Sequence, residues 1–444
     1  MGDLKQQAIE IFLRTLDAIE VKSVFDRKIR VEGRLLFAGE SVIDLNRYKE
    51  VVAIGLGKAS LRMGKALEEA LGDRLTRGVL VTSQQDYLSL GPGIEVLVGG
   101  HPVPTVGSLR AGERLVRVAE SCGSGSLIIF LISGGGSALA ECLLAPEILL
   151  EDLKSLNQTL IRCGANIREI NTVRKAISKI KGGGLGRVAA ATGADFVGVY
   201  ISDVNQGDLR SIASNPVLSE EPAREGALEV IGKYNLSSRL PATILGVLES
   251  FHTAPLTDTS RDSILGTVLL CDNRMALECA GRVAAGLGFE THIFDDLVEG
   301  DYRDVAVQMI ERLSVLRSRF PDMPLCVISG GEVSCVVSGN GVGGRNQEFV
   351  LYSATKLGEP CVGTRPIAVL SCGTDGIDGN SLAAGAVSDR HCIEEAITNG
   401  IDPGLYLREN DSFSFFSQMG GLLLTGPTGT NVRDIRILLS APDR

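Results

Sequence analysis

Apolar runs of strand length alternate with helical patterns along this chain. In its first half such runs lie at residues 51–54, 78–82, 127–132 and 195–201. Strands that are apolar throughout are typical of a parallel sheet whose two faces are both covered by helices. The sequence therefore predicts an α/β fold with a Rossmann-like, doubly wound sheet in this half of the chain.

A second series of strands and helices follows a change in composition after about Leu240. Residues 241–262 contain two prolines and many serines and threonines, which is typical of a boundary between domains. Further strands are expected at 265–270, 325–328, 366–370 and 421–424. Because 444 residues are too many for one core, we predict two α/β domains, residues 1–245 and residues 260–444.

The composition argues against several classes of protein. A net charge of −10 disfavours a general nucleic-acid or anionic-membrane binder. Residues 1–13 have the pattern of an amphipathic helix rather than of a secretory signal, and no uncharged apolar stretch reaches the ~18 residues of a membrane span. The ten cysteines form no C-x-x-C pair and the four histidines lie far apart. We therefore expect reduced thiols, no zinc site and a cytoplasmic location.

Glycine-rich motifs follow two of the predicted strands. The first ends in Gly57 and Lys58; a lysine at the start of a helix is disfavoured by the helix dipole unless an anion joins it. The second is a run of three glycines between two serines: Ser133, Gly134, Gly135, Gly136 and Ser137. Such a loop favours a nest of backbone N–H groups for phosphate. A solvated lysine and a flexible turn are the alternatives.

The first motif resembles half of a dinucleotide-binding fingerprint. Ser60 stands where the third glycine is needed, and no acidic residue closes a second strand about 20 residues on. The spacing also differs from that of a P-loop. Hydride transfer is therefore disfavoured, and binding of an anion at Lys58 remains.

Two further segments carry local positive charge or an arginine that follows two glycines. Arg174 and Lys175 begin a basic stretch that reaches Lys181, for which a solvated helix face is the alternative. Arg345 follows Gly343 and Gly344, where its guanidinium could grip a carboxylate or phosphate at the mouth of a helix. The alternative is a glycine-rich turn with an ordinary helix cap.

Carboxylates at strand ends could bind a metal or act as a base. Asp203 follows one strand directly, and Asp375 and Asp378 lie three residues apart in a glycine loop. Oxygen ligands of this kind suit Mg²⁺, although Asp-Gly turns are common without function.

Taken together, the motifs resemble those of the class II glycerate 2-kinases. They include VAIGLGKAS, GHPVP, LISGGGSA, INTVRK, ISDV, ISGGE, GGRNQE, CGTDGIDG and GPTGTNV, in the family's order over most of the chain. The resemblance implies a glycerate-kinase-like domain followed by a MOFRL-type α/β domain, with the active site in the cleft between them. It also implies transfer of the γ-phosphoryl group of ATP, with Mg²⁺, to the 2-hydroxyl of D-glycerate to give 2-phospho-D-glycerate.

The resemblance also implies roles for particular residues. The expected catalytic residues are Lys58, Arg345 and Asp203, and the expected metal ligands are Asp203, Glu332 and Asp375. Substrate binding is expected at Lys58, Arg345 and Ser60. Nucleotide binding is expected at Ser133, Gly134, Gly135, Gly136, Ser137, Asn171 and Lys181.

Departures from the family's usual residues, among them Asn215, Val217 and Leu382, leave the acceptor open. The alternatives are a kinase for a related small hydroxy acid, a non-catalytic nucleotide or metabolite sensor, and a hydroxypyruvate reductase, a label that genes of this family have also carried. The expected partners are a small hydroxy acid and a nucleotide, with a homodimer left open.

Overall fold

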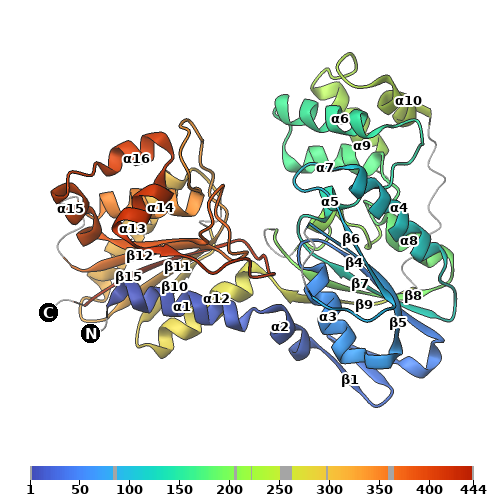
Figure 1. Ribbon diagram of the computed structural model, residues 1–444, viewed down its shortest axis with the longest axis horizontal. Helices are drawn as coiled ribbons and strands as arrows, with labels where there is room; N and C mark the ends of the chain where they lie inside the picture. Colours follow the sequence, from blue (N-terminus) through green and yellow to red (C-terminus); the bar gives the residue numbers. More distant parts are fainter. Residues whose placement is uncertain are drawn as a thin grey trace. The chain divides into compact units, whose positions relative to one another are not determined.

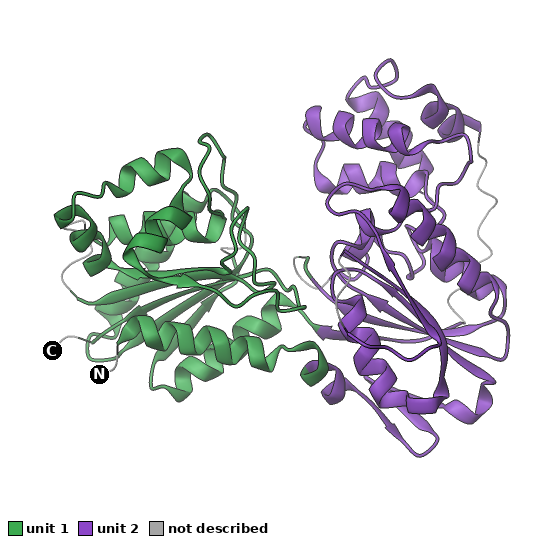
Figure 2. Cartoon of the chain, viewed as in Figure 1, with its two compact units in different colours: residues 1–23, 203–207, 271–444 green, residues 24–202, 208–270 purple. Residues whose placement is uncertain are grey.

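The computed structural model describes residues 3–83, 88–204, 208–221, 223–250, 263–296, 299–358 and 365–442 (Figure 1). The chain forms two compact units (Figure 2). The N-terminal unit comprises residues 24–202 and 208–270, and the C-terminal unit comprises residues 1–23, 203–207 and 271–444. Each unit is described by itself.

The N-terminal unit contains a six-stranded sheet of order β6-β5-β4-β7-β8-β9. Its strands are β4 Glu50–Leu56, β5 Leu75–Thr82, β6 Ile94–Val98, β7 Ser126–Ile132, β8 Asp195–Ile201 and β9 Ile264–Cys271. The pairs from β6 through β8 are parallel, with Leu56 of β4 opposite Ile132 of β7. Every residue of β7 is buried, as its unbroken apolar sequence predicts. The doubly wound parallel sheet expected here is confirmed.

Helices cover both faces of this sheet. Figure 1 shows α3 Ser60–Leu71 on one face and α4 Val106–Glu120 with α8 Gly184–Ala191 on the other. Helix α3 lies very close to the strands because it has a glycine at Gly64, where a Cβ atom would lie 2.3 Å from Leu80 Cδ1. An antiparallel sheet of β1 Ile29–Glu32, β2 Leu35–Ala38 and β3 Ser41–Asp44 follows α2 Val21–Lys28.

A separate group of helices has its own core within the N-terminal unit. It consists of α6 Leu150–Arg162, α7 Ile167–Ala176, α9 Arg224–Lys233 and α10 Ala242–Ser250. Their buried apolar side chains include Leu153, Leu156, Val173 and Ile244. Helix α7 begins at a reciprocal cap in which Asn166 and Glu169 accept from each other's backbone N–H groups.

The C-terminal unit contains a second six-stranded sheet, of order β10-β11-β15-β12-β13-β14. Its strands are β10 Glu290–Phe294, β11 Leu325–Gly331, β12 Ile367–Gly373, β13 Gly385–Asp389, β14 Leu422–Leu423 and β15 Asp434–Ser440. Among the strand pairs that the structure describes in this sheet, β10 and β11 are parallel and the others are antiparallel. The sheet is therefore mixed, because β15 returns from the end of the chain and inserts antiparallel between β11 and β12.

Helices also cover both faces of the second sheet. Figure 1 shows α1 Leu4–Ala18 and α12 Asn273–Gly286 beneath it and α13 Tyr302–Arg319 and α14 Arg345–Lys356 above it. Three further helices lie near α14: α15 Arg390–Thr398, α16 Pro403–Glu409 and α17 Ser412–Met419. Short helical turns elsewhere are α5 Gly136–Leu139, η1 Leu45–Arg47, η2 Gly72–Arg74 and η4 Ile212–Ser214.

Most of the expected strands are present, and one expectation about their arrangement needs correction. The strand at 264–271, expected to open the second series, instead lies beside β8 at the edge of the first sheet. The amphipathic helix expected at the N-terminus is confirmed as α1, which packs on the sheet of the C-terminal unit. The domain ranges 1–245 and 260–444 stay a prediction.

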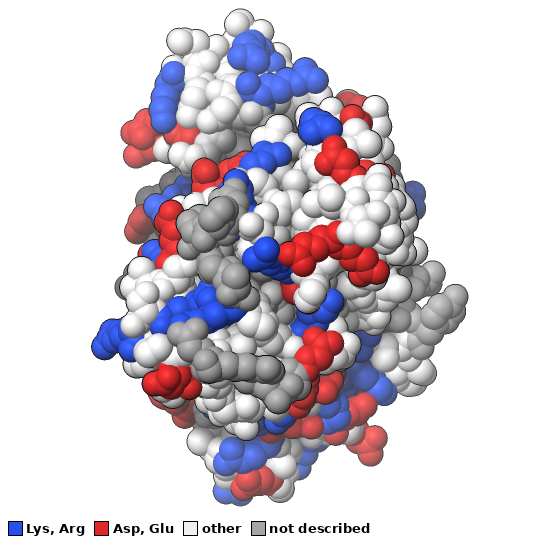
Figure 3. Space-filling model, turned by 90° about the vertical axis from the view of Figure 1, so that its left-hand side faces the viewer, with Lys and Arg blue, Asp and Glu red and all other residues white. Residues whose placement is uncertain are grey.

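The surface and the thiols agree with an ordinary globular protein. Figure 3 shows Lys and Arg interspersed with Asp and Glu over the face it draws. The cysteines in the described part of the chain are free thiols. Within the described residues, no helix has the length and apolar character needed to cross a membrane.

Candidate functional site

The strand order of the N-terminal unit reverses between β4 and β7. From β4 the chain proceeds outward to β5 and β6, whereas from β7 it proceeds in the opposite direction to β8 and β9. In open α/β sheets, ligands bind at the carboxyl ends of the strands where the order reverses. Here those ends are followed by Gly57 and Lys58 after β4 and by residues 133–137 after β7.

These two loops are locked together by backbone contacts. Ser133 N donates to Leu56 O at 3.0 Å, and Lys58 N donates to Gly134 O at 2.9 Å. The Ser133 hydroxyl accepts from Ala59 N at 3.0 Å. A Cβ atom on Gly57, whose φ is +130°, would lie 2.2 Å from Ser133 Oγ. The glycine therefore lets the two loops meet, and the Ser133 hydroxyl supports that contact.

The loop after β7 presents a series of backbone donors. Within the described part of the chain, the N–H groups of Gly134, Gly135, Gly136 and Ser137 donate to no acceptor. Gly135 has φ +80°, and successive N–H groups around a left-handed residue form a concave nest that suits an anion. A Cβ atom on Gly135 would lie 3.2 Å from both Lys58 Cγ and His101 Cδ2, so Lys58 borders the nest.

A strained turn supports the far side of this loop. Ser137 Oγ and Ser214 Oγ are 2.7 Å apart, and Ser214 Oγ donates to Asn171 Oδ1 at 3.2 Å. Ala213, Ser214 and Asn215 have φ values of 50°, 59° and 55°, which non-glycine residues rarely adopt. Such strain persists only where surrounding contacts hold it, and it is common at functional sites.

Two residues expected at the site are buried in internal contacts. Lys181 is 2% exposed and forms an ion pair with Glu141, which also accepts from Ser178 Oγ at 2.5 Å. Ser60 is fully buried and its hydroxyl donates to Val81 O at 2.7 Å. Both side chains therefore form internal contacts that support the structure around the loop. Their expected contacts with ligands stay predictions.

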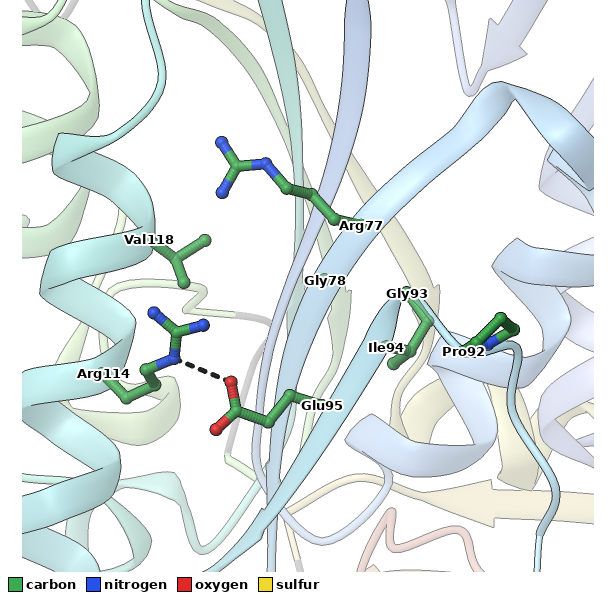
Figure 4. A pocket seen from close by; sticks show the side chains of 8 residues that line it. All are labelled: Arg77, Gly78, Pro92, Gly93, Ile94, Glu95, Arg114 and Val118. Carbon is green, nitrogen blue, oxygen red and sulfur yellow. Dashed lines mark hydrogen bonds and ion pairs between the residues drawn. The ribbon is translucent and has the colours of Figure 1, made fainter.

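A cavity of about 270 Å³ lies at the opposite, amino ends of β5 and β6 (Figure 4). Its charged side chains are already paired: Arg114 Nε donates to Glu95 Oε2 at 2.7 Å, and Arg77 Nε donates to Glu50 Oε2 at 2.9 Å. Because parallel sheets bind ligands at the carboxyl ends of their strands, this cavity is a weaker candidate than the nest at 134–137.

In the C-terminal unit, Arg345 is held by carboxylates of the same chain. Its Nε and Nη2 donate to the two oxygens of Asp434 at 2.6 and 2.9 Å, and Nη2 also donates to Glu332 Oε1 at 3.2 Å. Asp434 is fully buried, and the Arg345 side chain is 34% exposed. These carboxylates and Asp378 raise the pKa of Arg345 above its ordinary value despite burial. The guanidinium thus binds two oxygens of one carboxylate, and that carboxylate is Asp434 of the same chain rather than a ligand.

The mouth of helix α14 is likewise filled by a residue of the chain. Asp378 accepts from the backbone N–H and the side-chain amide of both Asn346 and Gln347, at 2.9 to 3.2 Å. A Cβ atom on Gly344 would lie 2.3 Å from Asp378 Cγ. Burial raises the pKa of Asp378 to about 6, and these hydrogen bonds oppose the shift. The group at the helix N-terminus is therefore the carboxylate of Asp378, and the expected binding of a ligand there stays a prediction.

The three expected metal ligands have separate surroundings. Glu332 contacts Arg345, Asp375 Oδ1 accepts from Ile377 N at 3.3 Å, and the backbone oxygen of Asp203 accepts from Arg433 Nε at 2.6 Å. Among the described residues, no group of three or more His, Cys, Asp or Glu side chains is arranged to hold a metal ion. The residues described therefore do not form a metal cage made of protein ligands alone.

The sequence alone pointed to Asp378 as one of two carboxylates in a glycine loop, but it did not identify Asp434 or Glu141 as site residues. Asp434 starts an apolar strand 89 residues after Arg345, so no local spacing links the two. Glu141 lies in a short apolar stretch, and a charge flanked by apolar residues was the available signal.

Comparisons with known proteins show the family of this chain. Residues 7–249 match a domain of unknown function, DUF4147, and residues 325–434 match the MOFRL family. A Thermotoga maritima protein named D-glycerate 2-kinase is 34% identical and 98% of each chain is covered. An Agrobacterium vitis protein provisionally named hydroxypyruvate reductase is 37% identical over 87% of this chain and 86% of its own. The crystal structure of glycerate kinase from Thermotoga maritima has a TM-score of 0.83 at 30% identity, covering 99% of both chains.

Proposed function

Because this chain belongs to the class II glycerate 2-kinase family, which joins a DUF4147 domain to a MOFRL domain, we propose that it phosphorylates the 2-hydroxyl of D-glycerate with ATP. The product would be 2-phospho-D-glycerate. Phosphoryl transfer asks a protein mainly to position the reactants and to neutralise charge on the transferring group. The residues of the two units can be assigned to these tasks.

The nest at 134–137 carries this proposal. Its backbone N–H groups have no acceptor within the described chain, and it lies at the strand-order reversal where α/β sheets bind ligands. We assign it to the phosphates of the nucleotide. Lys58 borders the nest and would neutralise charge on the phosphoryl group during transfer.

We propose a narrower role for Arg345 than a grip on two oxygens of a ligand. Asp434 already takes Nε and Nη2, whereas Nη1 forms no hydrogen bond among the described residues. Asp434 would orient the guanidinium so that Nη1 meets an oxygen of the transferring phosphate. That Arg345 and Lys58 serve one substrate stays a prediction from the sequence.

ATP and Mg²⁺ are the proposed cofactors. Mg²⁺ is commonly held by one or two carboxylates together with substrate phosphates, so a cage of protein ligands is not required. Asp203, which follows Ser202 after β8, is the residue that we propose as such a ligand, with Glu332 and Asp375 as further candidates. When bound, the ion would neutralise phosphate charge. Excess chelator should therefore stop turnover.

A hydroxypyruvate reductase is the second candidate, because a relative carries that provisional name. The glycines after β4 argue against it. Gly57 gives room for Ser133 rather than for a pyrophosphate, and the position of the third glycine is Ser60, whose hydroxyl is bonded to Val81. We therefore expect no oxidation of NADH or NADPH with hydroxypyruvate.

A screen of ADP formation with D-glycerate and related hydroxy acids tests the proposal. We expect D-glycerate to give the highest kcat/KM, and phosphorus NMR of the product to show a phosphate on the 2-hydroxyl. A product phosphorylated at another oxygen would contradict transfer to the 2-hydroxyl. A higher kcat/KM with another hydroxy acid would identify that acid, rather than D-glycerate, as the acceptor. Nucleotide binding without ADP formation would favour a non-catalytic sensor.

We also propose a cytoplasmic location, since the free thiols of the described chain suit a reducing compartment. A homodimer is the assembly proposed for the protein. Sedimentation at micromolar concentration would test it, and a monomeric mass would contradict it.

A further inference from the structure

A small cavity adjoins the nest within the N-terminal unit. Its volume is about 170 Å³. Apolar side chains from the segment before α4, from α5 and from α6 contribute Pro102, Pro104, Ala138 and Leu153. The remaining lining residues are His101, Gly135, Ser137, Glu141, Asn157 and Arg174. The cavity therefore connects the loop at 134–137 with the group of helices that contains α7.

The charges around this cavity leave one cation without a counter-charge. Glu141 is 2% exposed and its charge is compensated by Lys181, which is equally buried. Burial and the nearby Lys58 lower the pKa of His101, so this imidazole is neutral near pH 7. Arg174 is the remaining charged group of the lining, so Glu141, its partner Lys181 and Arg174 together carry a net charge of about +1 near pH 7.

Arg174 has a positioning contact but no ion pair. Its Nε donates to Asn157 Oδ1 at 2.7 Å, and within the described residues no carboxylate lies within ion-pair distance of it. The contact leaves the two terminal nitrogens of the guanidinium for other acceptors. Burial lowers the pKa of Arg174, while Glu141 opposes the shift without pairing directly. A half-buried arginine without a carboxylate partner is costly unless an anion from outside joins it.

The size of the cavity selects a small anion. An apolar cavity of about 150 Å³ accommodates benzene, which has six heavy atoms, whereas pockets for drug-sized ligands are roughly 300–1,000 Å³. Glycerate, a three-carbon acid with two hydroxyls, has seven heavy atoms and matches the volume of about 170 Å³. A nucleotide does not fit within it.

We propose that this cavity binds the hydroxy acid, with its carboxylate on the terminal nitrogens of Arg174. A guanidinium offers two parallel N–H groups, which match the geometry of a carboxylate. Gly135 and Ser137 of the nest also line the cavity, so the hydroxyl of the acid would face the nest that holds the nucleotide phosphates. This inference rests on the proposed function and adds the residue that recognises the acceptor.

Steady-state kinetics of Arg174→Gln test the assignment. We expect the KM for D-glycerate to rise about 10- to 100-fold, the loss typical of a hydrogen bond between charged groups. The KM for ATP should stay within about twofold. Arg168→Gln is the matched control, because Arg168 is an exposed arginine on the same helix, and it should leave both KM values unchanged.

Calorimetric titration with D-glycerate in the absence of nucleotide gives a second measurement. Arg174→Lys keeps the charge but loses the two parallel donors, so its affinity should fall between those of the wild type and Arg174→Gln. It also serves if Arg174→Gln fails to fold, which thermal melting would reveal.

The outcomes separate the two proposals. Wild-type protein that forms no ADP with any hydroxy acid would refute the proposed function. Active wild type together with an unchanged KM for D-glycerate in Arg174→Gln would overturn the carboxylate site alone. A rise in the KM for ATP, with that for D-glycerate unchanged, would place a nucleotide phosphate at Arg174 and also overturn it.

Discussion

At the scale of single residues, several basic side chains of this protein are paired with carboxylates of the same chain. Arg345 is held by Asp434, and Lys181 is held by Glu141. A buried charge without a partner costs several kcal/mol, so such pairs form wherever the fold allows them. Next to the nest, Lys58 is the cation that we assign to the phosphates of the nucleotide.

Replacing Lys58 by alanine should lower kcat by about 100-fold or more, which corresponds to about 3 kcal/mol of barrier. The melting temperature should change little, because the side chain is not part of the core. Lys65→Ala is the control, since Lys65 lies on α3, which begins two residues after Lys58, in a partly exposed pair with Glu68 and should leave kcat unchanged. If Lys58→Ala turned over at nearly the wild-type rate, Lys58 would not neutralise charge on the transferring phosphoryl group.

Replacing Arg345 by lysine should lower both kcat and stability. A lysine cannot hold both oxygens of the fully buried Asp434, so we expect a loss of about 1–3 kcal/mol in unfolding free energy. A fall in kcat with KM nearly constant would indicate action on the transferring phosphate. Arg408→Lys is the control, because Arg408 forms an exposed ion pair with Asp402 and the same substitution there should change neither kcat nor stability. Unchanged kcat in Arg345→Lys would leave only a structural role.

At the scale of elements, loops and helix ends determine which backbone groups remain available. Among the residues that the structure describes, the N–H groups of the nest at 134–137 donate to no acceptor, whereas the mouth of α14 is filled by Asp378. The two motifs look alike in sequence because each has glycines between an apolar strand and a helix. They differ because a carboxylate from residues 373–379 reaches the second motif.

Replacing Gly135 by valine should weaken ATP binding by about tenfold or more. The change adds strain at φ +80° and crowds Lys58 and His101 at 3.2 Å. Gly164→Val is a matched control, because Gly164 has the same φ of +80° but has nothing within 4 Å of the added atom. Calorimetry should therefore show weaker nucleotide binding in Gly135→Val alone. Equal affinities in the two folded variants would make the loop a structural turn.

Glu348 on α14 should make stability depend on pH. Burial raises its pKa to about 7 from 4.5, while the hydroxyl of Tyr302 donates to it at 3.3 Å. The folded state therefore holds this proton more tightly than the unfolded state. Its contribution is complete below pH 4.5 and is lost as pH rises through about 7, an effect of about 3 kcal/mol.

Urea unfolding from pH 4.5 to 8 would measure this effect. Glu348→Gln should remove this part of the fall in stability and should be more stable than the wild type at pH 8. Asp378, whose pKa is also raised, would still cause a smaller fall up to about pH 6. Parallel curves for the wild type and Glu348→Gln would contradict the shift.

At the scale of the whole molecule, the chain passes between the two units several times. Residues 1–23 belong to the unit formed mainly by 271–444, and β9 belongs to the other. Helix α1 covers the lower face of the second sheet in Figure 1 and buries Leu4, Ala8, Ile11 and Phe12.

Phe12→Ala should therefore destabilise the C-terminal unit by about 3–5 kcal/mol, as for a core phenylalanine. Leu13→Ala is the control, since Leu13 lies next to it on the same helix and is 43% exposed. Hydrogen exchange of α14 amides would report the effect within that unit. Equal protection in both variants would show that α1 is dispensable there.

Sequence pattern by itself determined the strands, the parallel sheet of the N-terminal unit and the family. These features follow from local periodicity and from motifs of adjacent residues, which need no knowledge of distant contacts. It also placed the glycine loop at 133–137 and Lys58 at the ends of two strands, whereas the structure showed that the strand order reverses between those strands.

Only the tertiary structure decided which charged groups remain available. Asp434 and Asp378 reach Arg345 and the mouth of α14 from 89 and about 32 residues away, and Lys181 reaches Glu141 over 40 residues. The same holds for β15, which enters the second sheet from the end of the chain and makes it mixed. Ion pairs and strand partners are formed by residues that folding brings together, so their separation along the chain carries no signal of the contact.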